Sequence, residues 1–326
     1  MKRPRPVHHV GDVVRLDHVI VVRKTTAVEQ QASRPDRRLA QLIGKRDPLT
    51  SRVLGAHEEH MASLARVEAE LTARHIDHRV VSSFGRREAV RASLVVTVGG
   101  DGTFLRASHA IDASSESDGP PMLGVNSAAS SSVGYFCAAG ADAFGALLDQ
   151  IAAGEIRSRG LWRLQVAING KPIRDLALND VLLAHQSPAE TSRYILKVGD
   201  EAQDHKSSGL WVATAAGSTA AIRSAGGYLL DVDERKLQYR SRELMLWALE
   251  GKPLEAGVLE ELEVISRMYT GMVYLDGGHL RQAFGFGDHI TFTLAPRPMP
   301  WVAPHELDER RQRWIEKTQA AIHSPL

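Results

Sequence analysis

The sequence predicts an α/β protein of two domains. The first carries a parallel sheet, and the second is β-rich, of the antiparallel sandwich type. Apolar runs such as His18–Val22 and Ala92–Val98 alternate with segments of helical spacing in the first half. From about Leu161, short alternating segments follow one another closely, with turn signals between them. A final helical segment, Ala303–His323, is expected to pack back on the first domain.

Length and composition set the number of domains. The chain has 326 residues, of which 43% are hydrophobic and 24% are charged, and this is typical of a globular protein with about two domains. We therefore expect an α/β domain over residues 1–160 plus 303–326 and a β-rich domain over residues 161–302.

Charge and cysteine content limit the partners and the compartment. The 40 basic and 39 acidic residues give a net charge of +1, so no general field favours nucleic acid or an anionic membrane. No apolar run reaches the ~18–20 residues of a membrane span, and the N-terminus lacks the apolar core of a secretory signal. The single cysteine, Cys137, excludes a disulfide within the chain and is expected to be a buried, inert thiol. These features favour a cytoplasmic protein.

The other elements of the first half follow from periodicity. Ser51–His75 has apolar residues at helical spacing, and Ala139–Glu155 is amphipathic. Residues 25–50 are polar and suggest a long loop or a short helix. Met122–Asn126 is predicted to be a short strand. Because strands and helices alternate, the strands are expected to run parallel, with crossover connections.

A Gly-Gly-Asp-Gly-Thr turn, Gly99–Thr103, follows the strongest apolar run. Glycines allow close backbone approach and positive φ, and a helix starting near Thr103 presents N–H groups and a positive dipole end to an anion such as phosphate. Asp101 repels phosphate, so it needs another role. It could take a proton from an attacking hydroxyl, hold Mg²⁺, or simply cap the helix.

A second candidate site lies in the β-rich half. Lys206–Gly227 is rich in Gly, Ala, Ser and Thr, which suits close approach to a ligand but equally suits a tightly packed turn. Asn179 and Asp180 interrupt an apolar strand-like run. Buried polar groups need partners, so at least one of the two is expected to face a site, unless they mark a strand end or bulge.

These residues together resemble the NAD kinase family. Four segments match in order: Gly99–Thr103, Gly124–Phe136, Asn179-Asp180, and Ser208-Gly209 through Gly227. The resemblance implies transfer of the γ-phosphate of ATP, or of polyphosphate, to the 2′-hydroxyl of the adenosine ribose of NAD or NADH. It also makes residues 161–302 the dinucleotide-binding domain and implies a homodimer or a higher homo-oligomer. The amino-acid sequence of the last segment is more similar to that of the plant and mitochondrial-type branch of the family than to that of other members.

The resemblance also assigns roles residue by residue. Asp101 is the catalytic residue, and Mg²⁺ is expected to be carried by ATP rather than by protein side chains. The turn residues Gly99, Gly100 and Thr103 hold phosphate. The dinucleotide is bound by Gly102, Arg106, Asn179, Asp180, Lys206, Ser208, Thr219, Ala220 and Ser224. The chain departs from the family pattern at Ser208, where most members have aspartate, and at Ala221, where a tyrosine is usual.

Two rival functions share some of these features. A lipid kinase of the diacylglycerol or sphingosine type has the same glycine turn and a β-rich second domain. A non-catalytic NAD(H)-binding sensor is compatible with the departures in the family motifs. Two further groups are interpreted as solvated helix faces: His57 with His60, and Asp308–Arg313.

Overall fold

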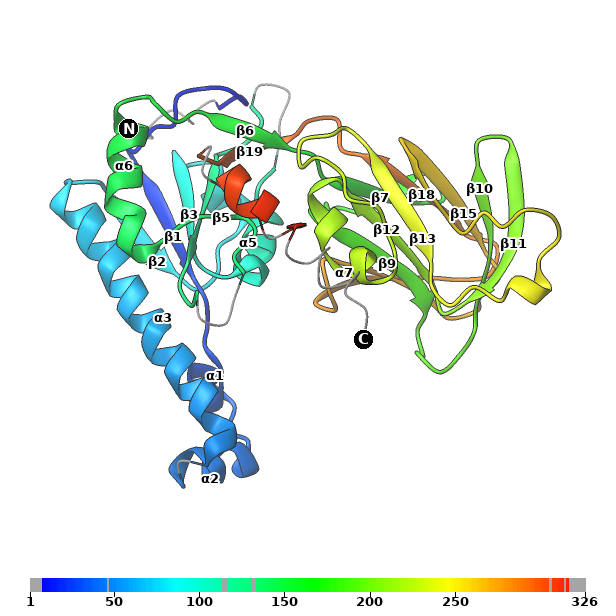
Figure 1. Ribbon diagram of the computed structural model, residues 1–326, viewed down its shortest axis with the longest axis horizontal. Coiled ribbons are helices and arrows are strands. Elements are labelled where there is room, and N and C mark those ends of the chain that lie inside the picture. Colours follow the sequence, from blue (N-terminus) through cyan, green and yellow to red (C-terminus); the bar gives the residue numbers. More distant parts are fainter. Residues whose placement is uncertain are drawn as a thin grey trace. The chain divides into compact units, whose positions relative to one another are not determined.

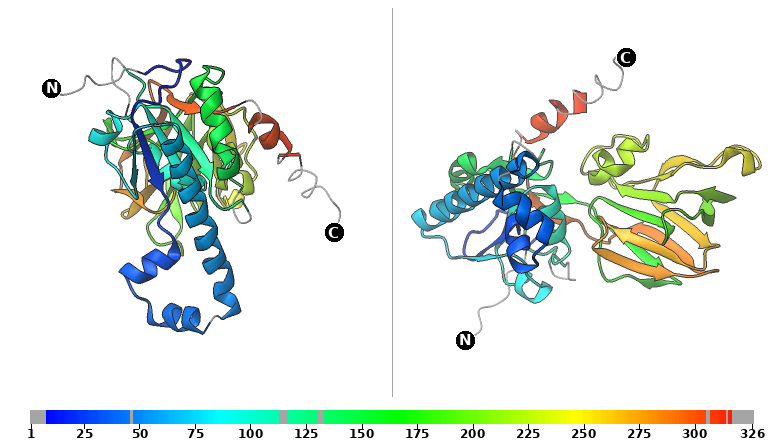
Figure 2. Two further views of the ribbon diagram at one scale, coloured as in Figure 1. Left: turned by 90° about the vertical axis from the view of Figure 1, so that its left-hand side faces the viewer. Right: turned by 90° about the horizontal axis from the view of Figure 1, so that it is seen from below.

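Two compact units make up the chain. The computed structural model describes residues 8–45, 47–112, 117–129, 133–304, 307–313 and 315–316. Unit 1 comprises Met1–Arg159 with Pro300–Leu326, and unit 2 comprises Gly160–Met299. Figures 1 and 2 show a mixed helix and sheet architecture in unit 1 and a β-rich body in unit 2.

The sheet of unit 1 has the strand order β2-β1-β3-β4-β19-β6, with β5 beside β4, and its central pairs are parallel. Strands β1 and β3 are buried along nearly their whole length, as expected of continuous apolar runs in a parallel sheet. The strands are β1 (Val19–Arg23), β2 (His78–Val81), β3 (Leu94–Gly99), β4 (Met122–Asn126), β5 (Cys137–Gly140), β6 (Ser158–Leu161) and β19 (Met299–Val302).

The core of unit 1 joins this sheet to α3 (Pro48–Ala73) and α6 (Phe144–Ala152). Leu64, Val67 and Leu71 of α3 pack in one cluster with alternate residues of β1 and β3, because their spacing places them on one helix face. Figure 2 shows α3 extending past the sheet, with short helices beside its first turns. The remaining helices are α1 (Ala27–Ser33), α2 (Arg37–Gly44), α4 (Arg86–Ala89), α5 (Asp101–Ser108) and the 3₁₀ turn η1 (Ala141–Ala143).

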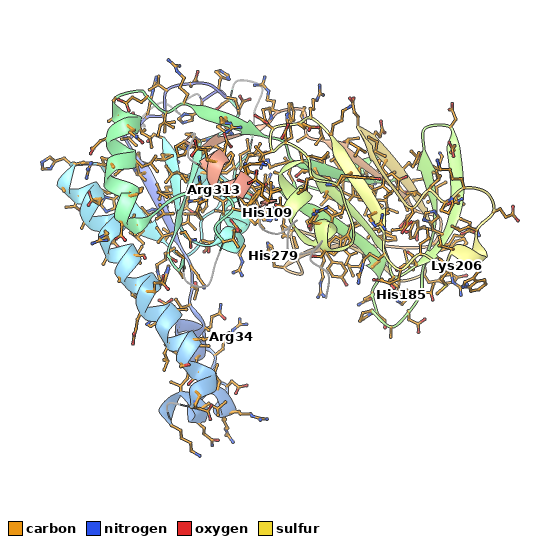
Figure 3. All side chains as sticks on the ribbon, viewed as in Figure 1. Arg34, His109, His185, Lys206, His279 and Arg313 are labelled. Atoms are coloured by element: carbon orange, nitrogen blue, oxygen red, sulfur yellow. The ribbon has the colours of Figure 1, made fainter. Side chains whose placement is uncertain are left out.

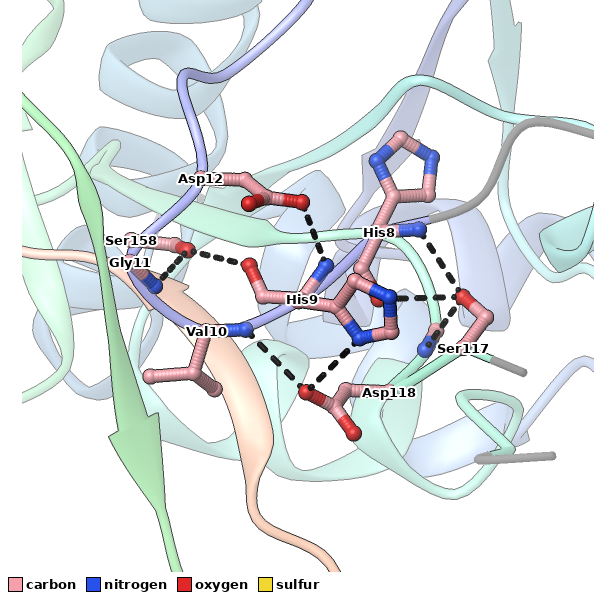
Figure 4. A network of polar contacts seen from close by, with 9 residues as sticks. His8, His9, Val10, Gly11, Asp12, Ser117, Asp118 and Ser158 are labelled. Carbon is pink, nitrogen blue, oxygen red and sulfur yellow. Dashed lines mark hydrogen bonds and ion pairs between the residues drawn. The ribbon is translucent and has the colours of Figure 1, made fainter. Parts of the chain in front are cut away.

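The segment that precedes β1 is fixed by a polar network (Figure 4). The hydroxyl of Ser117 accepts a hydrogen bond from the backbone N–H of His8 at 3.0 Å, and the carboxylate of Asp118 accepts one from Val10 at 3.1 Å. Ser158 accepts from the N–H of Gly11 at 3.1 Å. These contacts tie the start of the described chain to the body of unit 1.

Unit 2 is a sandwich of two antiparallel sheets. Their orders are β11-β10-β15-β18-β7-β8 and β14-β13-β12-β9-β16-β17. Alternate residues such as Val181, Leu183, Tyr194 and Leu196 form the core, as the period of 2 requires. The strands are β7 (Leu164–Ile168), β8 (Lys171–Pro172), β9 (Asp180–His185), β10 (Ser192–Val198), β11 (Glu201–Ser207), β12 (Leu210–Thr214), β13 (Leu237–Ser241), β14 (Ala256–Leu259), β15 (Glu261–Ser266), β16 (Gly271–Leu275), β17 (Leu280–Phe284) and β18 (His289–Leu294).

Three short helices complete unit 2: η2 (Ala216–Thr219), α7 (Ala221–Ser224) and η3 (Leu246–Ala248). The predicted fold class is confirmed, including a helix over residues 307–313 that packs on the rest of unit 1, where it contacts Arg159 and Gly134. Among the described residues, no helix is both long and apolar enough to cross a membrane.

Several local predictions were wrong. The segment expected to be helical from Ala139 begins with the end of β5, and its α-helix starts at Phe144. For residues 25–50, by contrast, the short-helix alternative is confirmed, because they contain α1 and α2. His60 is fully buried rather than solvated, and Arg311 is only 6% exposed. In both cases a neighbouring segment covers a helix face that looks polar in sequence.

Candidate active site

A cleft of about 520 Å³ lies in unit 1 at the carboxyl ends of parallel strands. This is where open α/β sheets bind their ligands. It contains the predicted site residues Gly100, Asp101, Gly102, Thr103 and Arg106. It is also lined by Val22, Arg23, Lys24, Thr25, Ala27, Gln30, Ser82, Ser127 and Ala128.

The glycine turn is built differently from the expectation. Helix α5 starts at Asp101 rather than near Thr103, with Gly100 as its N-cap in an extended conformation. The three glycines of the turn have no positive φ. Gly99 is required for packing instead, because a Cβ there would lie 2.2 Å from Oγ1 of Thr103. The first turn of α5 therefore opens directly on the cleft, with the partial positive charge of a helix start.

The carboxylate of Asp101 binds a neighbouring loop. One oxygen accepts a hydrogen bond from the N–H of Tyr135 at 2.9 Å and the other from the N–H of Phe136 at 2.8 Å. Asp101 is not the helix cap, so the capping alternative is excluded. Each carboxylate oxygen has a further lone pair, which leaves the group able to accept a proton or a hydrogen bond from a ligand.

The loop that holds Asp101 is itself supported from two sides. The ring of Phe136 stacks on Phe104 of α5 with 5.2 Å between ring centroids. Arg310, on the helix over residues 307–313, donates to the carbonyl oxygens of Gly134, at 3.1 Å, and Cys137. This helix lies more than 170 residues further along the chain, so no local sequence pattern could indicate its contribution.

Basic side chains provide charge for an anionic ligand. Lys24, at the end of β1, and Arg106 of α5 both line the cleft. Arg23 lines it too, but its guanidinium is paired with Glu29 at 2.5 Å. Lys24 was missed by the sequence analysis. The rule that ligands lie at the carboxyl ends of parallel strands could have identified it.

Ser127, which follows β4, is a second residue that was missed. Its hydroxyl lies 2.9 Å from Nδ1 of the buried His60, and its N–H donates to the carbonyl of Gly99 at 3.1 Å. Burial lowers the pKa of His60, so the imidazole is neutral near pH 7. The histidine thereby fixes the side chain of a cleft residue.

The candidate site in unit 2 forms around the start of β9. Asn179 precedes this strand and Asp180 is its first residue. The segment η2 to α7, which carries Thr219, Ala220 and Ser224, lies against them. A Cβ on Gly217 would lie 2.0 Å from the carbonyl oxygen of Asn179, so glycine serves close packing at this position.

The buried carboxyl groups here are unusual. Burial, together with the nearby charge of Asp276, raises the pKa of Asp180 to about 7. Burial also raises the pKa of Asp276 to about 6, although backbone hydrogen bonds and the positive charge of Arg163 oppose this. Oδ1 of Asn179 is buried and accepts no hydrogen bond from the described residues. This part of unit 2 therefore offers an unsatisfied acceptor and a carboxyl group that titrates near neutral pH.

Two predicted residues lie elsewhere in unit 2. Lys206 is on β11, at the far end of the sandwich from α7 (Figures 1 and 3). Ser208 lines a second pocket of about 480 Å³, together with Trp211 and Arg242. Within one chain, unit 2 therefore brings together Asn179, Asp180 and the segment 216–224, but not Lys206 or Ser208.

The fold and these sites define a class of protein. It is a two-unit protein with a cleft lined by basic side chains and a glycine turn at a parallel sheet, and with a cluster of small and polar residues on a β-sandwich. Comparison with known proteins identifies the family. The family described as "ATP-NAD kinase N-terminal domain" matches residues 18–156.

The chain is similar to curated proteins of the same kind. It is 35% identical over 238 residues to a "Probable NADH kinase" of Oryza sativa, which covers 66% of this chain and 72% of that protein. It is 30% identical over 245 residues to an "NADH kinase" of Arabidopsis thaliana, covering 68% and 76%. It is also 29% identical over 255 residues to an "NAD kinase" of Mycobacterium tuberculosis, covering 76% and 79%. The chain belongs to the NAD kinase family.

Solved structures agree on the fold. An NAD kinase from Archaeoglobus fulgidus in complex with ATP superimposes with a TM-score of 0.66 at 19% identity, covering 93% of this chain and 99% of that one. Yeast NADH kinase complexed with NADH superimposes with a TM-score of 0.66 at 15% identity, covering 95% and 89%.

Proposed function

We propose that this chain is an NAD(H) kinase, which transfers the γ-phosphate of ATP to the 2′-hydroxyl of the adenosine ribose of NAD or NADH. Membership of the NAD kinase family supports the reaction class. The observation that carries the assignment to this chain is Asp101. Its carboxylate is fixed by two backbone N–H groups at the first turn of a helix, in a cleft that also holds Lys24 and Arg106.

The chemistry follows from that arrangement. The 2′-hydroxyl oxygen forms a bond to the γ-phosphorus, the bond to the bridging oxygen of ADP breaks, and the hydroxyl proton passes to Asp101. The positive end of α5, with Lys24, stabilises charge on the transferring phosphoryl group. Gly99, Gly100 and Thr103 shape the turn that approaches the phosphates.

The acceptor dinucleotide is assigned to the other predicted residues. Oδ1 of Asn179 is the buried acceptor that a ribose hydroxyl or an amine of the ligand would satisfy. Asp180, with a pKa of about 7, can either donate or accept a hydrogen bond. Thr219, Ala220 and Ser224 belong to the adjoining segment, and Gly102 and Arg106 to the cleft of unit 1. Lys206 and Ser208 remain assigned on the family resemblance.

Four finer points belong to the same proposal. A divalent cation, Mg²⁺ by preference, accompanies ATP and is held mainly by its phosphates, where it neutralises their charge. The donor is ATP, with polyphosphate as the alternative to test. The protein is a homodimer or a higher homo-oligomer, which light scattering would detect. Its single buried cysteine suits the reducing cytoplasm.

A panel of donors and acceptors tests the function. Purified protein is incubated with ATP or polyphosphate and with NAD, NADH, diacylglycerol or sphingosine, and phosphate transfer is followed with labelled donor. Transfer to NAD or NADH is expected. Transfer to a lipid alone would overturn the proposal in favour of a lipid kinase. Binding of NAD with no turnover would favour a sensor.

The matched variants are Asp101→Asn and Asp142→Asn. Asp101→Asn is expected to lower kcat by about 100-fold or more with NAD affinity retained, because a general base contributes this much. Asp142 lies in the same unit with its side chain 87% exposed, and its variant is expected to behave as wild type. A fully active Asp101→Asn protein would refute the role of Asp101.

A further inference from the structure

Asp276 is a buried carboxylate of unit 2 that the sequence analysis did not include among the candidate site residues. It follows β16 with a φ of +47°, in the left-handed region, and is 9% exposed. Its carboxylate accepts three backbone hydrogen bonds. The donors are the N–H groups of Leu178 and Asn179, each at 2.7 Å, and of Asp180 at 3.2 Å.

The three donors are consecutive residues. Their segment includes Asn179 and Asp180, the two residues predicted to bind the acceptor dinucleotide. The carbonyl side of this segment is held by a different residue. Oγ1 of Thr214 donates to the carbonyl of Leu178 at 2.6 Å, and the N–H of Thr214 donates to the carbonyl of Asn179 at 2.9 Å. Asp276 also donates its own N–H to the carbonyl of Asp180 at 2.9 Å. The backbone of residues 178–180 is therefore hydrogen-bonded on its N–H side to the carboxylate of Asp276 and on its carbonyl side to Thr214.

We propose that Asp276 is a positioning residue for the acceptor dinucleotide, which it serves by fixing the backbone from which Asn179 and Asp180 project. This inference rests on the proposed function, because it assumes that these two residues bind the acceptor. Asp276 does not touch the ligand in this scheme. Its carboxylate holds consecutive N–H groups, so the side chains of Asn179 and Asp180 keep one relative direction.

The charge on Asp276 is compatible with this role. Carboxylates accept stronger hydrogen bonds from N–H groups when ionised, and the guanidinium of Arg163, itself 1% exposed, favours the ionised form. An amide at position 276 would place an NH₂ group against one of the three backbone donors. Asn tolerates the left-handed conformation, so Asp276→Asn tests the carboxylate with little change in backbone preference.

The primary test compares Asp276→Asn with wild type in steady-state kinetics and in calorimetric binding of NAD and ATP. The variant is expected to raise KM and Kd for NAD by about tenfold, because at least one buried backbone donor loses its partner. KM for ATP is expected to stay unchanged. The matched control is Asp288→Asn. Asp288 also accepts a hydrogen bond from a backbone N–H at a turn between strands, from Gly285 at 2.7 Å. No hydrogen bond within the described part of the chain joins its side chain to residues 178–180, so KM for NAD should be unchanged in this variant.

A second variant keeps the inference testable if Asp276→Asn does not fold. Thr214→Val removes the hydroxyl that donates to the carbonyl of Leu178 in the same segment. This variant is expected to show the same rise in KM for NAD, with KM for ATP unchanged. Wild-type NAD affinity in a folded Asp276→Asn or Thr214→Val protein would overturn the positioning role, provided that Asn179→Ala loses NAD binding. If wild type itself neither binds nor phosphorylates NAD, the proposed function fails instead. The two failures are thus distinguishable.

Discussion

Gly217→Ala is a direct test of how the proposed acceptor site is built. The sequence left two readings of the Gly-Ser-Thr segment: contact with a ligand or tight packing. A Cβ at position 217 would lie 2.0 Å from the carbonyl oxygen, 2.4 Å from the carbonyl carbon and 2.7 Å from Cα of Asn179. Ordinary carbon contacts lie near 3.5–4.0 Å, so the overlap exceeds about 1 Å and falls on backbone that cannot rotate away.

The expected cost follows from overpacking. Adding a methyl group to a well-packed site costs typically about 1–3 kcal/mol, and the rigid neighbour here places Gly217→Ala near the upper end. For a unit of this size, about 3 kcal/mol corresponds to a fall in Tm of roughly 6–12 °C. Because Asn179 is the residue displaced, KM for NAD is expected to rise while KM for ATP is unchanged.

Thermal unfolding and steady-state kinetics measure the two effects. The matched control is Gly285→Ala in the same unit, where a new Cβ would meet only Oδ2 of Asp288 at an ordinary 3.8 Å. This control should keep both its Tm and its KM for NAD. A Gly217→Ala protein with the Tm and KM of wild type would refute the packing argument, because it would show that the segment tolerates a side chain.

Four further predictions concern buried or half-buried side chains. Burial raises the pKa of Cys137, so the native protein is expected to be inert to a thiol reagent at neutral pH and to react with one thiol only after unfolding. Burial lowers the pKa of His205 to about 4 from 6.5, so the folded chain binds fewer protons than the unfolded chain between these values. The free energy of unfolding should therefore decrease as the pH is lowered through that window, by up to about 1 kcal/mol at about pH 5.5. A His205→Gln protein should lack this decrease in urea unfolding. Asp180 acts in the opposite sense, because a folded pKa raised to about 7 gives stability that is present at low pH and lost as pH rises through 7. Asp180→Asn should therefore lose less stability than wild type between about pH 5 and pH 8. Arg310→Ala should lower kcat about tenfold by loosening the loop that binds the carboxylate of Asp101, the proposed catalytic residue, whereas Arg313→Ala, whose side chain is 69% exposed on the same helix, should not.

The sequence by itself determined the elements whose signals are local. Continuous apolar runs predicted β1 and β3, because strands of a parallel sheet are buried on both faces. Alternation and turn residues predicted the antiparallel sandwich. The glycine turn drew attention to Asp101 because a carboxylate among glycines needs a reason to be there. The sequence pattern could not reveal that a Cβ at Gly99 would collide with the side chain of Thr103, because this contact depends on the exact backbone path of the turn.

Only the tertiary structure decided which distant residues support the candidate sites. Asp276 accepts a hydrogen bond from the N–H of Asn179, which lies 97 residues away in the sequence. Ser127 and its partner His60 are 67 residues apart. Arg310 reaches back over 170 residues to the loop that holds Asp101. Such residues look like turn formers or solvated helix faces in sequence, because their partners are fixed by long-range packing. The candidate site residues carry a local sequence pattern, whereas the residues that hold them in place are brought there by the fold.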